Sequence, residues 1–379
     1  MLVSKEVGGY KINAVRLVDT DDMENDRWLE CRKHGPDGKI PFTVGGSDVA
    51  TVFGISPWNT PLELWRTKAG TFTPPPKDNA SQLAMGHYME DMSAALFEER
   101  MNNASLGEDQ HVYRLPCKGK GKYKVYKDTW MYQHRDCPWA LADFDRIYTR
   151  PDGSTGILEL KTTNFRYAEK WADGAFPAYY ETQLRFYMWL ADVQYGAFCC
   201  LSGFNPDNEC YIVEIERDLE YEEEMVEKLA SFIESLEIGI EPTMEEVDPK
   251  QALEGLARLY PVAKAMSAEM ELSASAYGQH LKVYTDCDAG IKELKAQIKT
   301  LEERRDAASV KIKEAVGDNP SAFCEMGDTV YSVGWKNRKS KSVDYAAMKK
   351  EAPDVYDRYV SENTSRTFSV KKYTKDTKK

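Results

Sequence analysis

The sequence contains no long hydrophobic run. Nowhere in its 379 residues is there an uninterrupted apolar stretch of about 18 residues, the length that a membrane-spanning helix needs. The first residues, MLVSKEVGGYKINAVRL, hold no long apolar run beside their lysine, so the sequence predicts neither export nor membrane insertion. The eight cysteines are scattered without a C-x2-C pair, which argues against a zinc ribbon and a disulfide framework. We therefore expect reduced thiols in a cytoplasm.

Positive charge is also in short supply. Lys and Arg number 50 against 62 Asp and Glu, a net charge of −12 that counts against a nucleic-acid partner, since such partners are bound through basic side chains. The distribution qualifies this conclusion, because residues 331–379 carry 13 Lys and Arg against 6 Asp and Glu. A second cluster, CKGKGKYKVYKD, carries five lysines between residues 118 and 127. A solvated surface and a DNA contact remain equal alternatives for the basic tail.

The order of hydrophobic patterns predicts an α/β fold with a C-terminal arm. Two helices around a glycine turn are expected between residues 26 and 70, with Ser47 as a helix cap, and MGHYMEDMSAALFEERM is expected to bury one apolar face. Short β-prone runs follow up to residue 163, including ALADFDRIYT, and then a helix, a strand pair and an acidic helix. We expect a core at 1–245, a helical arm at 246–318 and a basic α+β segment at 319–379.

The expected arm contains a heptad pattern. Positions that are uncharged apart from Arg305 recur at alternating spacings of three and four, typical of a coiled-coil helix. They are Tyr284, Cys287, Ile291, Leu294, Ile298, Leu301, Arg305, Ala308, Ile312 and Ala315. GDNP at 317–320 should end this helix, and a hairpin, a short helix and a last strand, SRTFSVKKY, are expected after it.

Residues 142–163, ADFDRIYTRPDGSTGILELKTT, present two carboxylates and an ammonium in one predicted hairpin. Alternate side chains of a strand share a face, so Glu159 and Lys161 should point together, and the hairpin should bring Asp145 beside them. Two carboxylates and the Leu160 carbonyl could hold Mg²⁺, and a lysine beside the metal suits hydrolysis of a phosphodiester. An exposed cross-strand salt-bridge ladder is the equal alternative from the hairpin alone.

Several further segments give the hairpin a context. Gln183 and Tyr187 lie at i and i+4 on the next helix, where a glutamine could orient the lysine or a phosphate. Together with the hairpin motifs CPWALADFDRI and GILELKTT, the chain resembles the PD-(D/E)xK nuclease superfamily, and most closely its lambda-exonuclease-like, YqaJ-type viral recombinase family. The resemblance also runs through WLECRKHG, VGGSDVATVFGISPWNTPLELW, GHYMED, PAYYETQLRFYMWLAD and EPT.

The resemblance implies a restriction-endonuclease-like core, a central mixed sheet flanked by helices, and roles for individual residues. Asp145 and Glu159 match the metal-binding carboxylates, Lys161 the catalytic lysine and Gln183 the glutamine of the Q-x-x-x-Y motif. Glu90 matches a helical glutamate that approaches the metal. The DNA-phosphate contacts fall on Arg32, Ser47 and Tyr187. Asp143 lies two residues before Asp145, so either aspartate could be the ligand.

The implied activity is a Mg²⁺-dependent exonuclease acting 5′ to 3′ on double-stranded DNA ends, with Mn²⁺ as a substitute metal and no iron–sulfur cluster. The remaining 3′ strand would pass to a single-strand annealing recombination protein, and a homo-oligomeric ring, such as a trimer, is expected. Basic side chains at Arg32, Lys161 and residues 118–127 would line a DNA channel. The alternatives are a RecB-like or Cas4-like nuclease of other polarity, or a catalytically inert interaction protein that docks through the arm and tail. The cytoplasm would be that of a bacterial host if a phage or prophage encodes the chain.

Overall fold

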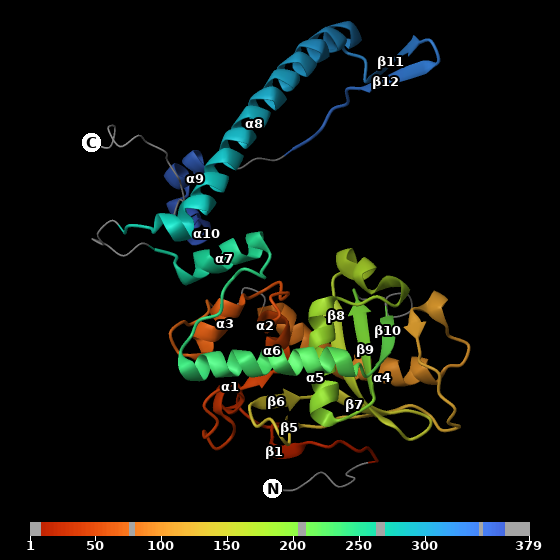
Figure 1. Cartoon of the computed structure of the whole chain (residues 1–379). Helices are drawn as coiled ribbons and strands as arrows, with labels where there is room; N and C mark the ends of the chain where they lie inside the picture. Colours follow the sequence, from red (N-terminus) through yellow and green to blue (C-terminus); the bar gives the residue numbers. More distant parts are fainter. Residues whose placement is uncertain (1–8, 76–79, 204–209, 263–269, 341–343, 361–379) are drawn as a thin grey trace. The chain divides into compact units, whose positions relative to one another are not determined.

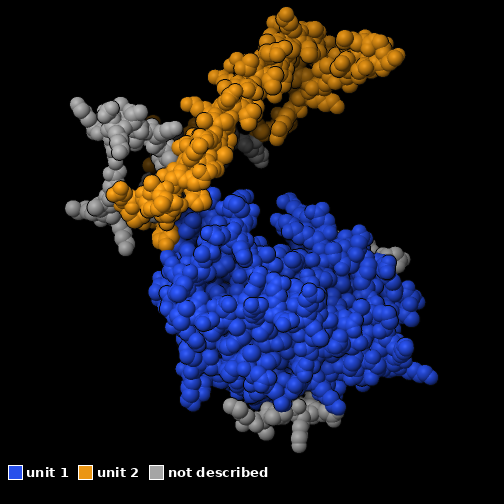
Figure 2. All heavy atoms as spheres, in the orientation of Figure 1, with its two compact units in different colours: residues 1–259 blue, residues 260–379 orange. Residues whose placement is uncertain are grey.

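The computed structural model of the protein describes residues 9–75, 80–203, 210–262, 270–340 and 344–360. The chain divides into two compact units, residues 1–259 and residues 260–379 (Figure 2). The first unit is built from two β-sheets and the helices around them, and the second from a long helix, a hairpin and two short helices (Figure 1). In the described residues no helix has the length and apolar character needed to cross a membrane.

A six-stranded mixed sheet forms the centre of the first unit. Its strands, in spatial order, are β3 (Val112–Tyr113), β10 (Cys210–Glu216), β9 (Tyr195–Ser202), β8 (Thr155–Thr163), β7 (Arg146–Thr149) and β4 (Lys124–Tyr126). β8 and β9 are parallel, and β7 pairs with β8 as an antiparallel hairpin. Gly153 adopts a φ of 86° in the turn of that hairpin, a conformation that glycine reaches without strain. The expected hairpin is therefore confirmed.

A smaller four-stranded sheet lies before the hairpin in the chain. It contains β1 (Val15–Asp19), β5 (Trp130–Gln133), β6 (Ala140–Asp143) and β2 (Val44–Gly45), in that order. The prediction of one β-prone run over ALADFDRIYT was wrong, because the chain leaves the small sheet after Asp143 and enters the large one at Arg146. Asp145 therefore stands at the junction between the two sheets.

Two helices, α4 (Ala80–Asn102) and α5 (Ala178–Ala191), cover the two faces of the large sheet. The other helices of the first unit are α1 (Asn25–His34), α2 (Gly46–Val52), α3 (Pro61–Lys68), α6 (Leu219–Ile238) and α7 (Pro249–Leu259), with 3-10 segments η1 (Glu108–Gln110) and η2 (Phe165–Gly174). On one face α4 packs Phe97 and Met101 against Leu158 and Leu160 of β8. On the other, α5 packs Leu184 into a second core cluster with Ile157 and residues of α6 (Figure 1). The expected α/β core, a central mixed sheet flanked by helices, is confirmed.

Two local predictions in these helices need correction. Ser47 is not the cap of α2: Gly45 is the N-cap, and its N–H donates to the Asp48 carboxylate at 3.0 Å. The helix α4 forms as expected, but only part of its predicted apolar face is covered. Met89 and Leu96 pack against the core, whereas Met85, Tyr88 and Met92 are exposed. The buried side chains lie on the C-terminal half instead, where Phe97 and Met101 meet the sheet; periodicity identified the helix but not which stretch of it the sheet covers.

The first unit extends to Leu259, beyond the boundary expected at residue 245. Thr60 and Glu63 form a capping box at the start of α3, and Glu63 is only 3% exposed. Arg258 of α7 donates to the two Glu63 carboxylate oxygens at 2.6 and 3.0 Å. This contact attaches α7 to α3 in the first unit, so a truncation at Pro242 would remove part of that unit.

The second unit begins with a long exposed helix. It contains α8 (Ala274–Val316), β11 (Ser321–Met326), β12 (Thr329–Gly334), α9 (Tyr345–Glu351) and α10 (Pro353–Tyr359). The expected helix over 284–315 is confirmed, and it ends at Gly317, which has a φ of 56°. The short helix expected near residue 350 is split in two at Pro353. The predicted last strand, SRTFSVKKY, lies outside the described residues.

Candidate active site

The junction between the sheets places Asp145 against the middle of β8. In the hairpin Arg146 pairs with Leu158, so the residue before Arg146 faces Glu159. The Asp145 carboxylate accepts the backbone N–H of Leu160 at 2.9 Å, which fixes its orientation. Because β8 alternates, Leu158 and Leu160 face α4 while Glu159 and Lys161 point to the face covered by α5, as the sequence predicted.

Glu159 is fully buried. One of its carboxylate oxygens accepts from the Lys161 ammonium, and the other, Oε2, has no hydrogen-bond partner among the described residues. Burial raises the pKa of Glu159 to about 8; repulsion from Asp145 adds to the shift, and Lys161 opposes it. Burial also raises the pKa of Asp145 above its ordinary range, against the attraction of Lys161. Lys161 therefore does not fully compensate the negative charge that Asp145 and Glu159 would carry together in this buried position.

A chain of polar contacts extends from Lys161 to α5. The ammonium lies 3.3 Å from Gln183 Oε1 and 4.7 Å from the centre of the Tyr180 ring. Gln183 in turn donates to the Tyr187 hydroxyl at 3.2 Å. Burial lowers the pKa of Lys161, but attraction by Glu159 and Asp145 outweighs this and raises it overall. Lys161 is therefore a cation held in place by a carboxylate and an amide.

Glu90 approaches the same hairpin from α4. Its Oε2 accepts from Arg146 Nη1 at 3.2 Å, and its Oε1 lies 2.9 Å from His87 Nδ1. Arg146 is 5% exposed and also donates to Asp91 Oδ1 at 2.6 Å and to the Asp145 carbonyl at 2.5 Å. Glu90 thus supports the backbone at Asp145 through Arg146, and both its oxygens already have partners. The sequence reasoning assigned no role to Arg146, although the residue directly follows the predicted ligand.

Arg32 and Ser47 form a second polar cluster. Arg32 Nη2 lies 3.3 Å from Ser47 Oγ, and the guanidinium lies over the Trp28 ring, 5.0 Å from its centre. A Cβ at Gly45 would stand 2.0 Å from Arg32 Nη2, and one at Gly46 would stand 2.5 Å from the Tyr187 ring. The two glycines therefore allow an arginine and a tyrosine to approach the same backbone.

Tyr187 and Asp143 join this cluster to the carboxylates. Burial raises the pKa of Tyr187 far above its ordinary value, with further repulsion from Glu159, while Arg32 lowers it. Burial also raises the pKa of Asp143, which Arg32 opposes and Asp145 reinforces. Both Asp143 carboxylate oxygens are buried, and a hydrogen bond from the Trp28 side chain also opposes the rise in the pKa of Asp143. The arrangement puts Asp143 within the electrostatic influence of Arg32, as well as of Asp145.

The donor set fits a hard cation through two carboxylates. In the described ranges no three His, Cys, Asp or Glu side chains are grouped closely enough to hold a metal ion. Asp145 and Glu159 nevertheless offer oxygen ligands, and the orphaned Oε2 of Glu159 is a buried acceptor without a donor. A cation there would offset the charge that burial disfavours.

The basic cluster at residues 118–127 lies elsewhere on the sheet. Its lysines are exposed, and Gly121 donates to the Pro151 carbonyl at 3.0 Å in the hairpin turn. That turn is the end of the hairpin farthest from Asp145, about 13 Å away along four strand residues. The lysines up to Lys124 therefore flank the far end of β7, whereas Lys127 follows β4 at its other end and lies 3.6 Å from Asp21.

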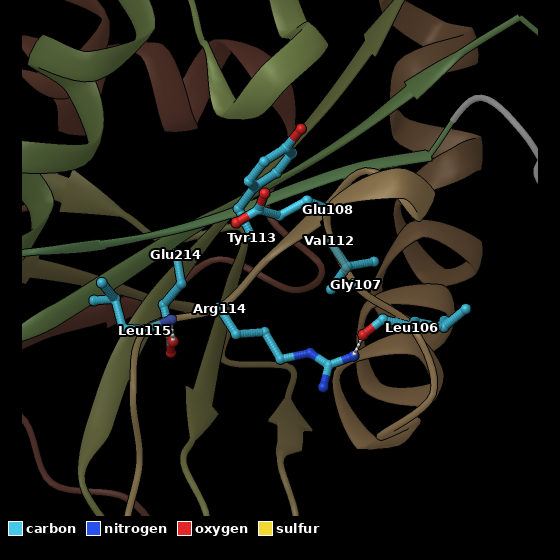
Figure 3. A pocket seen from close by; sticks show the side chains of 8 residues that line it. All are labelled: Leu106, Gly107, Glu108, Val112, Tyr113, Arg114, Leu115 and Glu214. Carbon is cyan, nitrogen blue, oxygen red and sulfur yellow. Dashed lines mark hydrogen bonds between the residues drawn. The ribbon is translucent and has the colours of Figure 1, made fainter.

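A separate open pocket of about 350 Å³ lies at the opposite edge of the large sheet, around β3 and β10 (Figure 3). Arg114 donates there to the Leu106 carbonyl at 2.8 Å, and Glu214 accepts the Leu115 N–H at 2.9 Å (Figure 3). Strands β8 and β9 stand between this pocket and Asp145. Its polar groups satisfy the backbone around η1 and β3.

One curated protein and several solved structures are similar to this chain. The uncharacterized protein YqaJ of Bacillus subtilis is 28% identical over 363 residues, which span 94% of this chain and 97% of that protein. The crystal structure of LHK-Exo in complex with dAMP is 20% identical with a TM-score of 0.42, covering 61% of this chain and 100% of that one. A phage-related exonuclease from Haemophilus somnus is 14% identical with a TM-score of 0.35, covering 52% and 93%.

Residues 27–194 match the family model of the YqaJ-like viral recombinase domain. This range contains the hairpin carboxylates, the lysine, the α5 glutamine and the Arg32 cluster. The resemblance seen in the sequence is therefore confirmed over residues 27–194, which are similar to the YqaJ-like viral recombinase domain.

Proposed function

We propose that the protein is a Mg²⁺-dependent exonuclease that hydrolyses phosphodiester bonds from the ends of double-stranded DNA in the 5′ to 3′ direction. The observation that carries the proposal is the convergence of Asp145, Glu159 and Lys161 on one face of β8, with Gln183 in contact with the lysine. The YqaJ-like domain supports a role in DNA recombination.

Asp145 and Glu159 are the proposed metal-binding carboxylates, with the Leu160 carbonyl as a further ligand. Mg²⁺, or Mn²⁺ in its place, supplies positive charge to the attacking and leaving oxygens when it is bound. Glu90 supports the site by holding Arg146 against the Asp145 carbonyl. Glu90 could bind the metal directly only after its contact with Arg146 breaks.

Lys161 supplies a fixed positive charge to the phosphate. Its raised pKa keeps the side chain protonated, so it donates a hydrogen bond to a phosphate oxygen and does not act as the resting base. Gln183 and the Tyr180 ring hold the ammonium in position. The contact with Glu159 restricts the lysine to the carboxylate side of the pocket.

Arg32 and Ser47 are the proposed site for the terminal phosphate of the DNA end. A guanidinium and a hydroxyl 3.3 Å apart suit phosphate oxygens, and Ser47 is exposed at the start of α2. Tyr187 separates this pair from the lysine pocket and shapes the space between them. Binding of a 5′ phosphate in one cluster and cleavage at the other would set the polarity of digestion.

The product is a 3′ single strand, which we propose is passed to a single-strand annealing protein in a bacterial cytoplasm. A ring of several copies, such as a trimer, would keep the enzyme on its substrate. The digestion experiment described below also distinguishes two alternatives, a RecB-like or Cas4-like nuclease of other polarity and an inert interaction protein. A core-only variant for comparison must extend to Leu259, since α7 belongs to the first unit.

The test is digestion of linear duplex DNA labelled separately at the 5′ and 3′ ends, with and without Mg²⁺. We expect mononucleotides from the 5′ end with the parent protein and with Asp136→Ala, an exposed aspartate, but not with Asp145→Ala. Release from the 3′ end would favour the other nuclease class. Absence of digestion under every condition would refute the nuclease proposal and point to an interaction protein.

A further inference from the structure

The helix α8 exposes its apolar stripe along its whole length. Its 43 residues are almost all exposed, and Val316 is the one that is buried. The aliphatic residues of the heptad pattern are large and about half exposed. They are Ile291 at 51%, Leu294 at 58%, Ile298 at 54%, Leu301 at 61% and Ile312 at 47%. An amphipathic helix of this length is stabilised by burying such a stripe, and the described residues of the second unit leave this one exposed.

The stripe is a regular two-position heptad. Tyr284, Ile291, Ile298, Arg305 and Ile312 occupy position a, and Cys287, Leu294, Leu301, Ala308 and Ala315 occupy position d. Large residues dominate the a positions throughout, but the d positions become small toward the C-terminus. A helix with this gradient cannot fill its own seam evenly when paired in parallel with a copy of itself.

We propose that α8 pairs with α8 of a second copy of this chain as an antiparallel coiled coil over residues 283–316. This proposal does not depend on nuclease activity. In an antiparallel pair each a position faces a d position of the other helix. With Ile298 opposite Leu301 of the second copy, the remaining layers are fixed by the heptad spacing.

Three of the four remaining layers match a large side chain with a small one. Tyr284 faces Ala315, Ile291 faces Ala308, and Ile312 faces Cys287. Seams in which large and small side chains alternate pack to a more even density than layers of two large or two small residues. Because the pairing is two-fold symmetric, every layer occurs twice, and one helix surface supplies both sides of the interface.

The charged residues also select this direction. In a parallel pair Arg305 would face Arg305 of the second copy, two like charges in the seam. The antiparallel pair places Arg305 opposite Leu294, where its alkyl stem can cover the leucine and its guanidinium can reach solvent. The parallel arrangement would also leave two layers of alanine against alanine.

The flanking positions select the register. In the proposed register Lys295 lies beside Glu302 of the second copy, on both sides of the two-fold axis. A shift by one heptad in one direction puts Lys295 beside Lys295, and a shift in the other puts Glu302 beside Glu302. Like charges in these positions destabilise the wrong pairings, so the proposed register combines the best packing with the only favourable flanking pair of the three.

A single cysteine tests both direction and register in the full-length protein. In the proposed dimer Ile312→Cys places a thiol opposite native Cys287 of the second copy, and Cys287 is exposed in the single chain. The two positions are about 37 Å apart along one helix, far beyond the roughly 7 Å limit for a disulfide within a chain. The matched control is Val310→Cys, two residues away on the outer face and 54% exposed.

After mild oxidation, a non-reducing gel and mass spectrometry of the linked peptides give the result. In the Ile312→Cys variant we expect a disulfide between Cys287 of one copy and the introduced thiol of the other, and in Val310→Cys we expect none. A link between the Cys287 residues of two copies in the parent protein would show a parallel pair and overturn the register. Equal linking in both variants, or no link between copies, would overturn the proposal. The linked peptides report on α8 alone, whatever oligomer the first units form.

Discussion

The substitution Glu159→Gln should stabilise the metal-free protein while removing its activity. Both side chains have the same size and fill the same fully buried site, so packing is retained. The glutamine cannot ionise, which removes the negative charge proposed to bind the metal. Its amide also places a donor group where Glu159 has an oxygen without a partner among the described residues.

The size of the stabilisation follows from proton binding. The pKa of Glu159 is about 8 in the fold, raised by burial, against an ordinary value of 4.5. The folded protein therefore holds a proton that the unfolded chain releases, and its stability falls as the pH rises from 4.5 to 8. At pH 7 this amounts to about 3 kcal/mol in favour of the glutamine variant, and at pH 5 to less than about 1 kcal/mol. Any pKa of Glu159 above about 7 in the folded protein gives nearly the same stabilisation at pH 7.

Urea unfolding in the presence of a chelator measures this difference at pH 5 and pH 7. Tryptophan fluorescence reports on the first unit, because seven of the eight tryptophans precede residue 260. Glu234→Gln is the control, since Glu234 is exposed on α6 and its substitution should leave both stabilities unchanged. Cleavage of linear duplex DNA with Mg²⁺ should be lost in Glu159→Gln and retained in Glu234→Gln.

A Glu159→Gln variant with the parent's stability at both pH values would refute the reasoning. It would show that Glu159 is ionised in the metal-free fold and that Lys161 compensates its burial in full. A variant that is stabilised as expected but still cleaves DNA would separate the two conclusions, since burial would hold and the metal-binding role would not.

Three further predictions concern other contacts. Lys161→Ala should fold like the parent and cleave about 10²–10³-fold more slowly, because it loses the cation beside the phosphate. The control is Lys170→Ala on η2, where the lysine is exposed and the initial rate should be unchanged. Equal rates in both variants would contradict the assignment. Arg32→Ala should raise the KM for 5′-phosphorylated DNA ends about tenfold or more and leave the KM for 5′-hydroxyl ends unchanged. An equal effect on both substrates would show that Arg32 does not bind the terminal phosphate. Arg258→Ala should lower the free energy of unfolding by about 1–3 kcal/mol, because buried Glu63 loses two hydrogen bonds. An unchanged urea midpoint would show that the Arg258–Glu63 pair does not hold α7 in place.

The sequence alone identified the elements that depend on local pattern. The turn chemistry before Gly153 predicted the hairpin, and the alternation of a strand placed Glu159 with Lys161 and opposite to Leu160. Heptad spacing predicted α8, and i to i+4 spacing placed Gln183 and Tyr187 on one face. These features follow from the fixed periods of strands and helices, which a sequence states directly.

Other features depended on which elements pack together. Only the fold shows that the chain changes sheets at Asp145, that Arg146 ties Glu90 to that junction, and that the Phe97 half of α4 is the part that the sheet covers. These contacts join residues that lie far apart in the sequence, and no local period encodes them.

The sequence by itself thus determined the strand and helix patterns, the resemblance over residues 27–194, and the residue types needed for phosphodiester chemistry. The tertiary structure decided how those groups affect one another. Burial raises the pKa of Glu159, attraction by the two carboxylates raises the pKa of Lys161, and two glycines let Arg32 and Tyr187 approach the same backbone. The physical reason is that side-chain chemistry is written in the sequence, whereas desolvation and distance exist only after the chain has folded.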